Sequence, residues 1–476
     1  MQRATCCSSA RLNKSIRKRM THQFDPTSLR EYDIRGIVGK SLGPGDATAI
    51  GRGFATRVRA IGGTRVAVGY DGRTSSPDLE AALVAGLRAG GIDVVRIGLG
   101  PSPMLYYAEA TLEVDGGIHV TGSHNPAEYN GFKMVLRHAP FFGDDITDLA
   151  RLARAGDWST GDGDVTDVAI IDAYVARLFA GYAGGRYRIG WDTGNGAAGP
   201  VIEKLVKLLP GEHHLLFTDV DGKFPHHHPD PTIEANLAHL KRLVTDNKLD
   251  FGVAFDGDGD RIGVVDALGR VLWGDQILSI LVEPLLRERP GATVVADVKS
   301  SQALFDRITA LGGTAVMAPT GHSLMKTAMT RTRAPLGGEL SGHLFFGGEY
   351  YGFDDAHYAA VRLIRAVHLS GRSLTELHDA MPALVATPDL RFPVDDDRKF
   401  AIVDAVIDRL TSDGAQIDRT DGARVTTPDG WWLLRASNTQ AMLTVRAEAR
   451  DAAALDRLLA QVDAHLAIAG VTRQRD

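Results

Sequence analysis

One segment of the sequence alternates acidic residues with glycine. Asp256, Asp258 and Asp260 are separated by single glycines and are followed by Arg261. Alternate residues of an extended segment lie on one face, so the three carboxylates can converge on one small cation. Oxygen ligands alone favour a hard ion, Mg²⁺ or Ca²⁺, and an EF-hand is excluded because its twelfth position would be Ala267. The alternative is an acidic turn, but its carboxylates would repel one another without a cation.

A second segment places a serine beside possible proton and charge partners. Ser123 follows a glycine at the end of an expected strand, His124 comes next, and Lys133 lies further along the chain. A serine in this position is exposed and can act as a nucleophile. The G-x-S-x-G pattern of a serine hydrolase is absent. An ordinary turn with a capping serine is the alternative.

A third candidate site lies near the C-terminus. One turn combines a guanidinium, two hydroxyls and an amide, and a second arginine lies on the next expected strand: Arg435, Ser437, Asn438, Thr439 and Arg446. A guanidinium fork with neutral donors beside it can hold a phosphate. A hydrogen-bonded β-turn without a ligand is the alternative.

Two other motifs resemble binding sites less closely. Residues 194–199 read G-N-G-A-A-G, and Asp219 lies 20 residues after Gly199. This pattern supports an alternative class, a nicotinamide-dependent oxidoreductase. The same glycines also permit a tight strand-to-helix turn, and no other segment resembles a hydride-transfer site. The run of three histidines at 226–228 lies between prolines, which predicts a surface or interdomain loop rather than a transition-metal site.

The segments that must position these residues repeat three times along the chain. Each round alternates short apolar runs with helical stretches, which predicts α/β units with largely parallel strands. The third run of each round ends in a polar, glycine-containing segment: residues 121–125, 256–261 and 337–343. Ligands gather where loops leave the carboxyl ends of strands in open α/β sheets. The rest of the chain, with a hairpin turning at residues 428–430, predicts an α+β domain.

The expected architecture is three similar mixed α/β domains followed by a smaller α+β C-terminal domain, with all four around a central cleft. Domain I, with the serine loop, is expected over residues 21–167, and domain II, with the acidic loop, over 168–272. Domain III is expected over 273–384 and domain IV, with the arginine turn, over 385–476. Residues 1–20 are expected to form a disordered basic extension.

The distribution of charge and cysteine excludes several classes of protein. Six of the 53 basic residues and no acidic residue lie in the first 19 positions, which leaves 47 basic and 59 acidic residues in the body. An acidic body argues against a nucleic-acid partner. Both cysteines, Cys6 and Cys7, lie in the basic stretch, so the body has no disulfide and no thiol nucleophile. Without a membrane span or a secretory signal, a cytoplasmic protein is expected.

Five motifs taken together resemble one family. They are EYDIRG at 31–36, TGSHNPAEYNGFK at 121–133, DGDGDR at 256–261, GELSGH at 338–343 and RASNT at 435–439. The family is the α-D-phosphohexomutase superfamily, in its bacterial phosphomannomutase/phosphoglucomutase branch. The resemblance implies an intramolecular phosphotransferase that interconverts hexose 1-phosphate and hexose 6-phosphate, of mannose, glucose or both. It also implies a phosphoserine enzyme and a 1,6-bisphosphate intermediate.

The resemblance implies a role for each candidate residue. Ser123 would carry the phosphoryl group, and this group would join Asp256, Asp258 and Asp260 in holding one Mg²⁺ ion. Glu339 and Ser341 would contact hydroxyls of the sugar ring. The phosphate that does not react would be held by Arg435, Ser437, Asn438, Thr439 and Arg446. The residues placed around the reacting group or the substrate would be Arg35, His124, Lys133, Arg261, Lys299, His322 and His343.

One position in the GELSGH segment at 338–343, here called the sugar loop, departs from the family pattern. Leu340 stands where relatives that use both glucose and mannose commonly have methionine, and where phosphoglucosamine mutases usually have glutamine. The loop therefore favours glucose and mannose without ranking them, and a phosphoglucosamine mutase is the alternative within the family. The general base would be His124 or His343. We expect glucose or mannose 1,6-bisphosphate as activator and a monomer or weak homo-oligomer, and a sugar-phosphate binding protein without turnover is a third alternative.

Overall fold

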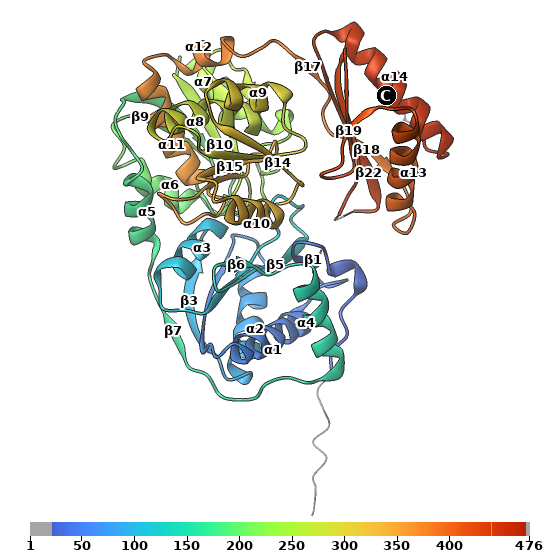
Figure 1. The fold of residues 1–476 in the computed structure, drawn as a ribbon. Helices are drawn as coiled ribbons and strands as arrows, with labels where there is room; N and C mark the ends of the chain where they lie inside the picture. The colour runs from blue at the N-terminus through green and yellow to red at the C-terminus, as the bar shows by residue number, and fades with distance from the viewer. Residues whose placement is uncertain (1–20, 439, 473–476) are drawn as a thin grey trace, which may run out of the picture.

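The computed structural model describes residues 21–438 and 440–472 (Figure 1). The expectation for residues 1–20, and the part of Thr439 in the phosphate turn, lie outside these ranges. Within them the chain forms four domains, with sheets of seven, five, four and six strands. In Figure 1 the blue N-terminal domain lies lowest, the green to orange middle domains lie above it, and the red C-terminal domain stands at the upper right.

Domain I is a sheet covered by helices, and its central strands are apolar because both of their faces are covered. Val66 and Val68 in one strand and Ile118 in its neighbour are fully buried. The first long helix begins at Pro44, whose fixed φ suits a first helical turn. After a short 3₁₀ turn (Pro26–Ser28), the elements are β1 (Ile34–Ile37), α1 (Pro44–Ala60), β2 (Arg65–Tyr70), α2 (Ser76–Ala89), β3 (Asp93–Leu99), α3 (Ser102–Thr111), β4 (Gly116–Val120), β5 (Tyr129–Leu136), β6 (Ala139–Pro140), α4 (Asp144–Ala155) and β7 (Val165–Asp167).

Domain II repeats this pattern with a smaller sheet. The strand that precedes the acidic loop has the sequence FGVAF and is buried at every position, as expected for a strand with helices on both faces. With a 3₁₀ turn at Glu234–Leu237, the elements are α5 (Ile171–Phe179), β8 (Tyr187–Asp192), α6 (Gly199–Leu205), β9 (Gly211–Leu216), α7 (Ala238–Asp246), β10 (Phe251–Phe255), β11 (Ile262–Asp266) and β12 (Val271–Leu272).

Domain III has the smallest sheet, of four strands. Its longest apolar helix after the sheet begins behind Asp355, whose carboxylate accepts a hydrogen bond from the main-chain N–H of Tyr358 and so caps the helix. The elements are α8 (Gly274–Glu288), β13 (Thr293–Asp297), α9 (Gln302–Ala310), β14 (Thr314–Ala318), α10 (His322–Thr332), β15 (Leu336–Gly338), β16 (Leu344–Phe346), α11 (Ala356–Ser370) and α12 (Leu374–Asp379).

Domain IV is an antiparallel sheet with two long helices packed on it. Its central hairpin turns at Pro428 and Asp429, with Thr427 paired to Gly430, at the position that the sequence predicts. The elements are β17 (Val385–Ala386), β18 (Leu390–Pro393), α13 (Lys399–Ser412), β19 (Gln416–Asp418), β20 (Ala423–Thr427), β21 (Gly430–Ala436), β22 (Met442–Ala449) and α14 (Ala452–Ile468).

The first three sheets share one topology. Each has three parallel strands followed by a fourth strand antiparallel to the third, in the orders β3-β2-β4-β5, β9-β8-β10-β11 and β14-β13-β15-β16. The expectation of mixed α/β domains with largely parallel strands is confirmed, and each repeat adds a fourth, antiparallel strand that the sequence analysis did not identify. A short loop returns the chain directly beside the third strand, which only antiparallel pairing allows. In every repeat this returning loop is the polar segment that the sequence singles out.

The apolar cores join some domains and separate others. Domains II and III share one core, in which Trp191 of β8, Leu278 of α8 and Tyr358 of α11 are buried together. Helix α3 of domain I also packs into this core, through Met104, Leu105 and Tyr106. Domain I has a second core around Phe54, and domain IV has one of its own around Trp432. Domains I to III are therefore joined by one continuous core, and domain IV attaches to them. Among the described residues, no helix combines the length and apolar character that a membrane span needs.

Two glycines allow α1 and α2 to cross closely in domain I. A Cβ atom on Gly51 would lie 2.4 Å from the carbonyl oxygen of Leu83, and one on Gly86 would lie 2.3 Å from that of Thr48. Because both neighbouring atoms belong to the backbone, no side-chain rotation can make room.

We predict that Gly51→Ala destabilises the protein by about 1–3 kcal/mol, the usual cost of overpacking a close contact. The measurement is the thermal unfolding midpoint. The matched control is Gly45→Ala in the same helix, where the nearest atom to a new Cβ, Cε1 of His22, is 3.8 Å away. Equal midpoints for the two variants would contradict the close crossing.

Candidate active site

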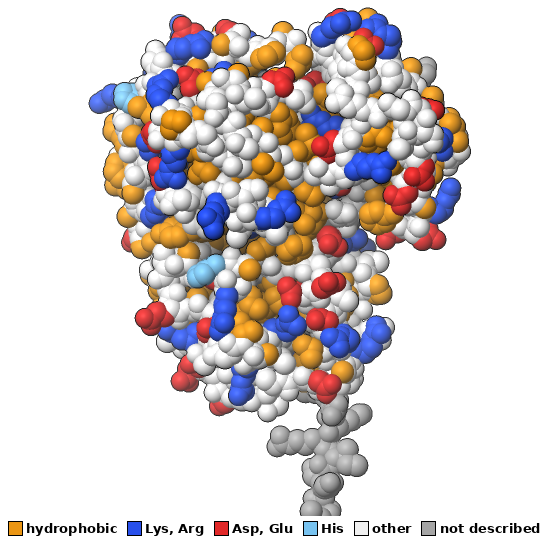
Figure 2. Space-filling view, viewed as in Figure 1, with side chains coloured by type: hydrophobic (Ala, Val, Ile, Leu, Met, Phe, Trp, Pro, Cys, Tyr) orange, Lys and Arg blue, Asp and Glu red, His pale blue; other side chains and the backbone are white. Residues whose placement is uncertain are grey.

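A cleft of about 1890 Å³ lies between the four domains, and each polar loop contributes to its lining. Ser123 comes from domain I, Arg261 from domain II, Glu339 from domain III and Ser437 from domain IV. On the face of the molecule drawn in Figure 2, basic and acidic side chains are interspersed. The charge that matters for a ligand is therefore the local charge of the cleft.

The serine loop connects β4 to β5 and holds Ser123 in a left-handed backbone conformation, with φ of 50°. For a non-glycine residue this conformation costs about 1–2 kcal/mol, so the surrounding contacts must maintain it. The main-chain N–H of Ser123 donates to Oγ1 of Thr121 (2.8 Å). Its hydroxyl lies 3.1 Å from Oδ2 of Asp256 and 3.2 Å from Nδ1 of His124. The serine is thereby aimed at the acidic loop.

A buried arginine that the sequence analysis did not single out holds the main chain of this loop and forms its floor. Arg73 follows β2 and is 1% exposed. Its Nε donates to Oδ2 of Asp71 (3.2 Å), and its other nitrogens donate to four carbonyl oxygens of the loop, those of Ser123 (2.7 Å), Asn125 (2.6 Å), Pro126 (2.6 Å) and Tyr129 (2.9 Å). Asp71 also accepts from the hydroxyl of Thr121 (2.8 Å). The polar YDGR segment at the end of an apolar run was the available signal.

The acidic loop connects β10 to β11, and all three of its aspartates are fully buried. Carboxylate oxygens of Asp256, Asp258 and Asp260 lie within 4.8 Å of one another. Lys133 reaches them from β5, and its Nζ donates to Asp258 (2.7 Å) and to Asp260. Among the described residues, no hydrogen-bond partner is available to Oδ1 of either of these two aspartates. The donor set therefore fits a hard cation.

The charge of the acidic loop is incompletely balanced by protein groups. Burial and the neighbouring charges of Asp260 and Asp258 raise the pKa of Asp256 well above its usual range. Burial also acts on Asp258, but the charge and hydrogen bond of Lys133 outweigh it and hold the pKa of Asp258 well below its usual range. One lysine thus compensates part of the cluster, and a divalent cation would compensate the rest.

The two candidate histidines differ in their surroundings. Burial and the charge of Arg261 lower the pKa of His124 well below its usual range, so this ring is neutral. His343 follows the sugar loop, and its Nε2 accepts a hydrogen bond from Nε of Arg261 (2.9 Å). Its Nδ1 lies 2.9 Å from Oδ2 of Asp354, which also pairs with Lys326 (2.7 Å). Asp354 and Lys326 were not predicted, because only the tertiary fold brings them behind His343.

Three further candidates, Glu339, Ser341 and His322, lie in domain III. Oε1 of Glu339 accepts from the N–H of Gly321 (2.7 Å), and the Ser341 hydroxyl donates to Oε2 of Glu339 (2.9 Å). His322 begins α10 and lines the same cleft. Burial and the charge of Lys326 lower its pKa well below the usual range.

The basic side chains that the sequence analysis singles out each have a partner within the protein. Arg35 pairs with Asp33 and donates to Asn125 (2.7 Å), and Lys299 pairs with Asp389. In domain IV, Nε of Arg435 donates to Asp421 (2.8 Å), and Arg446 donates to the carbonyl oxygen of Thr387 (3.2 Å). Asn438 donates to the hydroxyl of Tyr32, which itself donates to the carbonyl oxygen of Thr320 (2.9 Å). Tyr32 therefore links domains I, III and IV.

The glycine turn does not line the cleft, and only part of the histidine run does. Residues 191–199 are all buried, which leaves no open surface for a dinucleotide at the turn. Only His228 of the histidine run lines the cleft. His226 and His227 instead contact the glycine turn, through Asn195 and Asp192.

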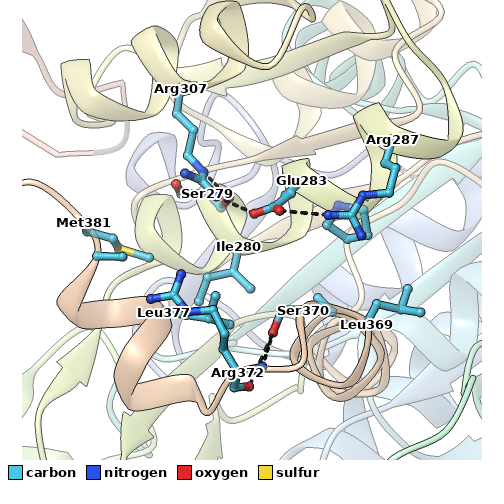
Figure 3. A pocket seen from close by; sticks show the side chains of 13 residues that line it. Ser279, Ile280, Glu283, Arg287, Arg307, Leu369, Ser370, Arg372, Leu377 and Met381 are labelled. Carbon is cyan, nitrogen blue, oxygen red and sulfur yellow. Dashed lines mark hydrogen bonds and ion pairs between the residues drawn. The ribbon is translucent and has the colours of Figure 1, made fainter.

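A second, much smaller pocket of about 40 Å³ lies among α8, α9, α11 and α12 (Figure 3). Two of its arginines share one carboxylate, since Glu283 accepts from Arg287 (3.0 Å) and from Arg307 (2.8 Å). This pocket is far smaller than a ligand site needs.

A serine aimed at a buried carboxylate cluster, with basic side chains along a four-domain cleft, is the arrangement of a phosphotransferase. Comparison with known proteins identifies the family. The models of the four phosphoglucomutase/phosphomannomutase domains match in order: α/β/α domain I over residues 26–157, domain II over 172–269, domain III over 273–384 and the C-terminal domain over 390–465. The chain belongs to the phosphoglucomutase/phosphomannomutase family.

Several relatives resemble the chain over nearly its whole length. It is 40% identical over 435 residues to a phosphomannomutase/phosphoglucomutase of Pseudomonas putida, covering 91% of this chain and 94% of the relative. It is 39% identical over 441 residues to a phosphoglucomutase of Neisseria meningitidis, covering 92% and 96%. The crystal structure of a phosphoglucomutase/phosphomannomutase family protein from Burkholderia thailandensis superposes with a TM-score of 0.90, at 39% identity and with coverage of 95% and 99%.

We predict that Arg73→Lys destabilises the protein by about 3 kcal/mol, because an ammonium group has three donors and would leave buried carbonyl oxygens of the serine loop without partners. Calorimetric unfolding measures the effect. Arg151→Lys, at an arginine whose side chain is 76% exposed, is the control and should leave the midpoint unchanged. A midpoint for Arg73→Lys equal to that of the control would contradict the role of Arg73 as the floor of the loop.

Proposed function

We propose that the protein is a phosphohexomutase that interconverts the 1-phosphates and 6-phosphates of mannose, glucose or both. The observation that carries this proposal is the position of Ser123, whose hydroxyl faces Asp256 at 3.1 Å in a cleft lined by all four domains. Relatives named phosphomannomutase/phosphoglucomutase support the same reaction. A serine that alternately gives and receives a phosphoryl group explains why one cleft serves both directions.

The reaction consists of two phosphoryl transfers. In the first, the bond from phosphorus to Oγ of Ser123 breaks, a bond to the 6-hydroxyl oxygen of a hexose 1-phosphate forms, and the hydroxyl proton passes to a base. In the second, after the sugar has turned over, the bond from phosphorus to the 1-oxygen breaks, a bond to Oγ of Ser123 forms, the serine hydroxyl gives up its proton and the leaving 1-oxygen takes one up. Because the transition state of phosphoryl transfer is loose, catalysis depends on positioning and on charge stabilisation.

Mg²⁺ is the cation that fits this chemistry, and Asp256, Asp258 and Asp260 would hold it together with the phosphate on Ser123. When bound, the ion would neutralise charge on the group being transferred. Lys133 already donates to Asp258 and lies beside the serine loop, so it offsets charge in the same place.

His343 is the better general base of the two candidates. The carboxylate of Asp354 lies 2.9 Å from Nδ1 of its ring and can hold a proton on that nitrogen. Nε2, which accepts from Arg261 (2.9 Å) here, would accept the substrate proton once it exchanges that partner. His124 has its pKa lowered by burial and by Arg261, which makes it a weak base, and it contacts Ser123 directly.

The loops of domains III and IV suit the two ends of a phosphosugar. Glu339 and Ser341 present oxygen atoms to ring hydroxyls from one wall of the cleft. Arg435, Ser437 and Asn438 line the cleft from domain IV and would hold the phosphate that does not react. Domain IV has a core of its own, and the apolar cluster that joins it to domain III is small, consisting of Val298, Trp431 and Leu433. Hinge motion of this domain would therefore let the bisphosphate turn.

We predict that incubation with glucose 1,6-bisphosphate adds about 80 Da, one phosphoryl group, to the protein at Ser123. Intact mass and peptide mapping measure the addition. Ser123→Ala should lose both the added mass and mutase activity, whereas Ser412→Ala, on a surface helix of domain IV, should retain both. A wild-type protein that binds hexose phosphates but never carries a phosphoserine would instead be a binding protein.

We predict that His343→Gln lowers the rate of phosphoryl transfer from phosphorylated Ser123 to glucose 1-phosphate by about 100-fold or more, because a general base typically contributes 10²–10⁴. Single-turnover transfer of a labelled phosphoryl group measures this rate. His124→Gln is the comparison and should lose about tenfold at most. The reverse order of effects would assign the base to His124.

A further inference from the structure

Two motifs have no place in the proposed reaction: the G-N-G-A-A-G turn at 194–199 and the histidine run at 226–228. They contact each other behind the acidic loop. We propose that together they position the acidic loop for its cation, with Gly196 and His227 as positioning residues. This inference rests on the metal site of the proposed function and concerns what holds that site in shape.

The glycine turn lies directly against the backbone of the acidic loop. The N–H of Ala197 donates to the carbonyl oxygen of Gly257 (3.0 Å), the residue between the first two aspartates. A Cβ on Gly196 would lie 2.8 Å from that same oxygen. A side chain at 196 would therefore push Gly257 out of place and break the hydrogen bond beside it.

On its other side the acidic loop lies against the serine loop. A Cβ on Gly257 would lie 2.5 Å from the carbonyl oxygen of Ser123 and 3.5 Å from Cγ of Pro229. Three backbone segments are thus stacked without side chains between them: the glycine turn, the acidic loop and the serine loop. A displacement of Gly257 moves Asp256 and Asp258, because they are its two neighbours in the chain.

The histidine run fixes the glycine turn from behind. Oδ1 of Asp192 accepts from the N–H of Gly194 (3.0 Å) and lies 3.0 Å from Nε2 of His227. A Cβ on Gly194 would lie 3.0 Å from Cβ of Pro229, so the run packs closely on the turn. His226 adds a bond from Nδ1 to Oδ1 of Asn195 (2.7 Å), a residue with φ of 59°.

His227 is held in its charged form. Nδ1 lies 3.0 Å from the carbonyl oxygen of His228 while Nε2 faces the carboxylate of Asp192, and both of these groups can only accept. Burial opposes the charge, but the hydrogen bond and the charge of Asp192 outweigh it and raise the pKa of His227. The pair therefore ties residues 226–229 to the glycine turn and, through Pro229, to the acidic loop.

The test compares four variants of the full-length protein by binding of Mn²⁺, a probe for Mg²⁺ sites, in the absence of substrate. Electron paramagnetic resonance of free Mn²⁺ gives the dissociation constant, and the unfolding midpoint in chelator gives stability separately. Gly196→Ala should bind Mn²⁺ about tenfold more weakly than the wild type. Gly45→Ala, where a new Cβ lies 3.8 Å from any neighbour, should bind as the wild type does.

His227 provides the second arm if Gly196→Ala does not fold. His227→Leu removes the donor to Asp192 and should weaken Mn²⁺ binding, whereas His227→Gln, which retains a donor near the same place, should restore most of it. Wild-type affinity in Gly196→Ala and in His227→Leu would overturn the inference and leave the proposed function intact. A wild-type protein that binds no Mn²⁺ would overturn the metal site of the proposed function, and the inference with it.

Discussion

Three carboxylates buried within 4.8 Å of one another are the constraint on which the rest of the molecule depends. Two like charges about 4 Å apart repel by about 4 kcal/mol even at an effective dielectric constant of 20. The ammonium group of Lys133 offsets this repulsion at Asp258 and Asp260. The main-chain N–H groups of Asp260 and Arg261 donate to the carboxylate of Asp256, both at 3.1 Å. Part of the negative charge beside Ser123 is therefore not balanced by protein groups. A cation bound there would supply the missing positive charge, and in doing so it would draw a phosphoryl group to the same place.

The fold positions its site loops in the same way in three domains. Each of the first three sheets ends its parallel part with a strand whose loop returns antiparallel, and that loop faces the cleft. A loop held by two adjacent, hydrogen-bonded strands has little freedom, so a hairpin tip can carry a nucleophile, a metal cluster or a sugar-binding acid with equal precision. Domains II and III share a core, which keeps the acidic loop and the sugar loop in a constant relation. Domain IV has a core of its own and meets domain III through the small apolar cluster of Val298, Trp431 and Leu433, so it can move relative to the other domains more easily than they can move relative to one another.

The parts of this design that are contiguous in sequence could be predicted, and the parts that depend on tertiary contact could not. Asp256, Asp258 and Asp260 can be recognised from their spacing in the sequence, and the structure brings their carboxylates together. Arg73 lies 50 residues before the serine whose carbonyl oxygen it holds, so no local pattern connects the two. Asp354 likewise meets His343 only because the chain turns back after β16. The antiparallel fourth strand was not identified, because the elements expected for each repeat ended at its polar segment.

The acidic body of the chain and its anionic substrates are reconciled by pairs of opposite charge. Arg35, Lys299 and Arg435 face the cleft, yet each already contacts an aspartate. A phosphate that binds to such a residue exchanges one anionic partner for another, so it gains less free energy than it would from an unpaired cation. Tight binding of a bisphosphate would be a disadvantage here, because the intermediate must leave one phosphate site and enter the other before the cycle can finish. A cleft of paired charges would recognise phosphate at both ends of the sugar while leaving either end able to exchange.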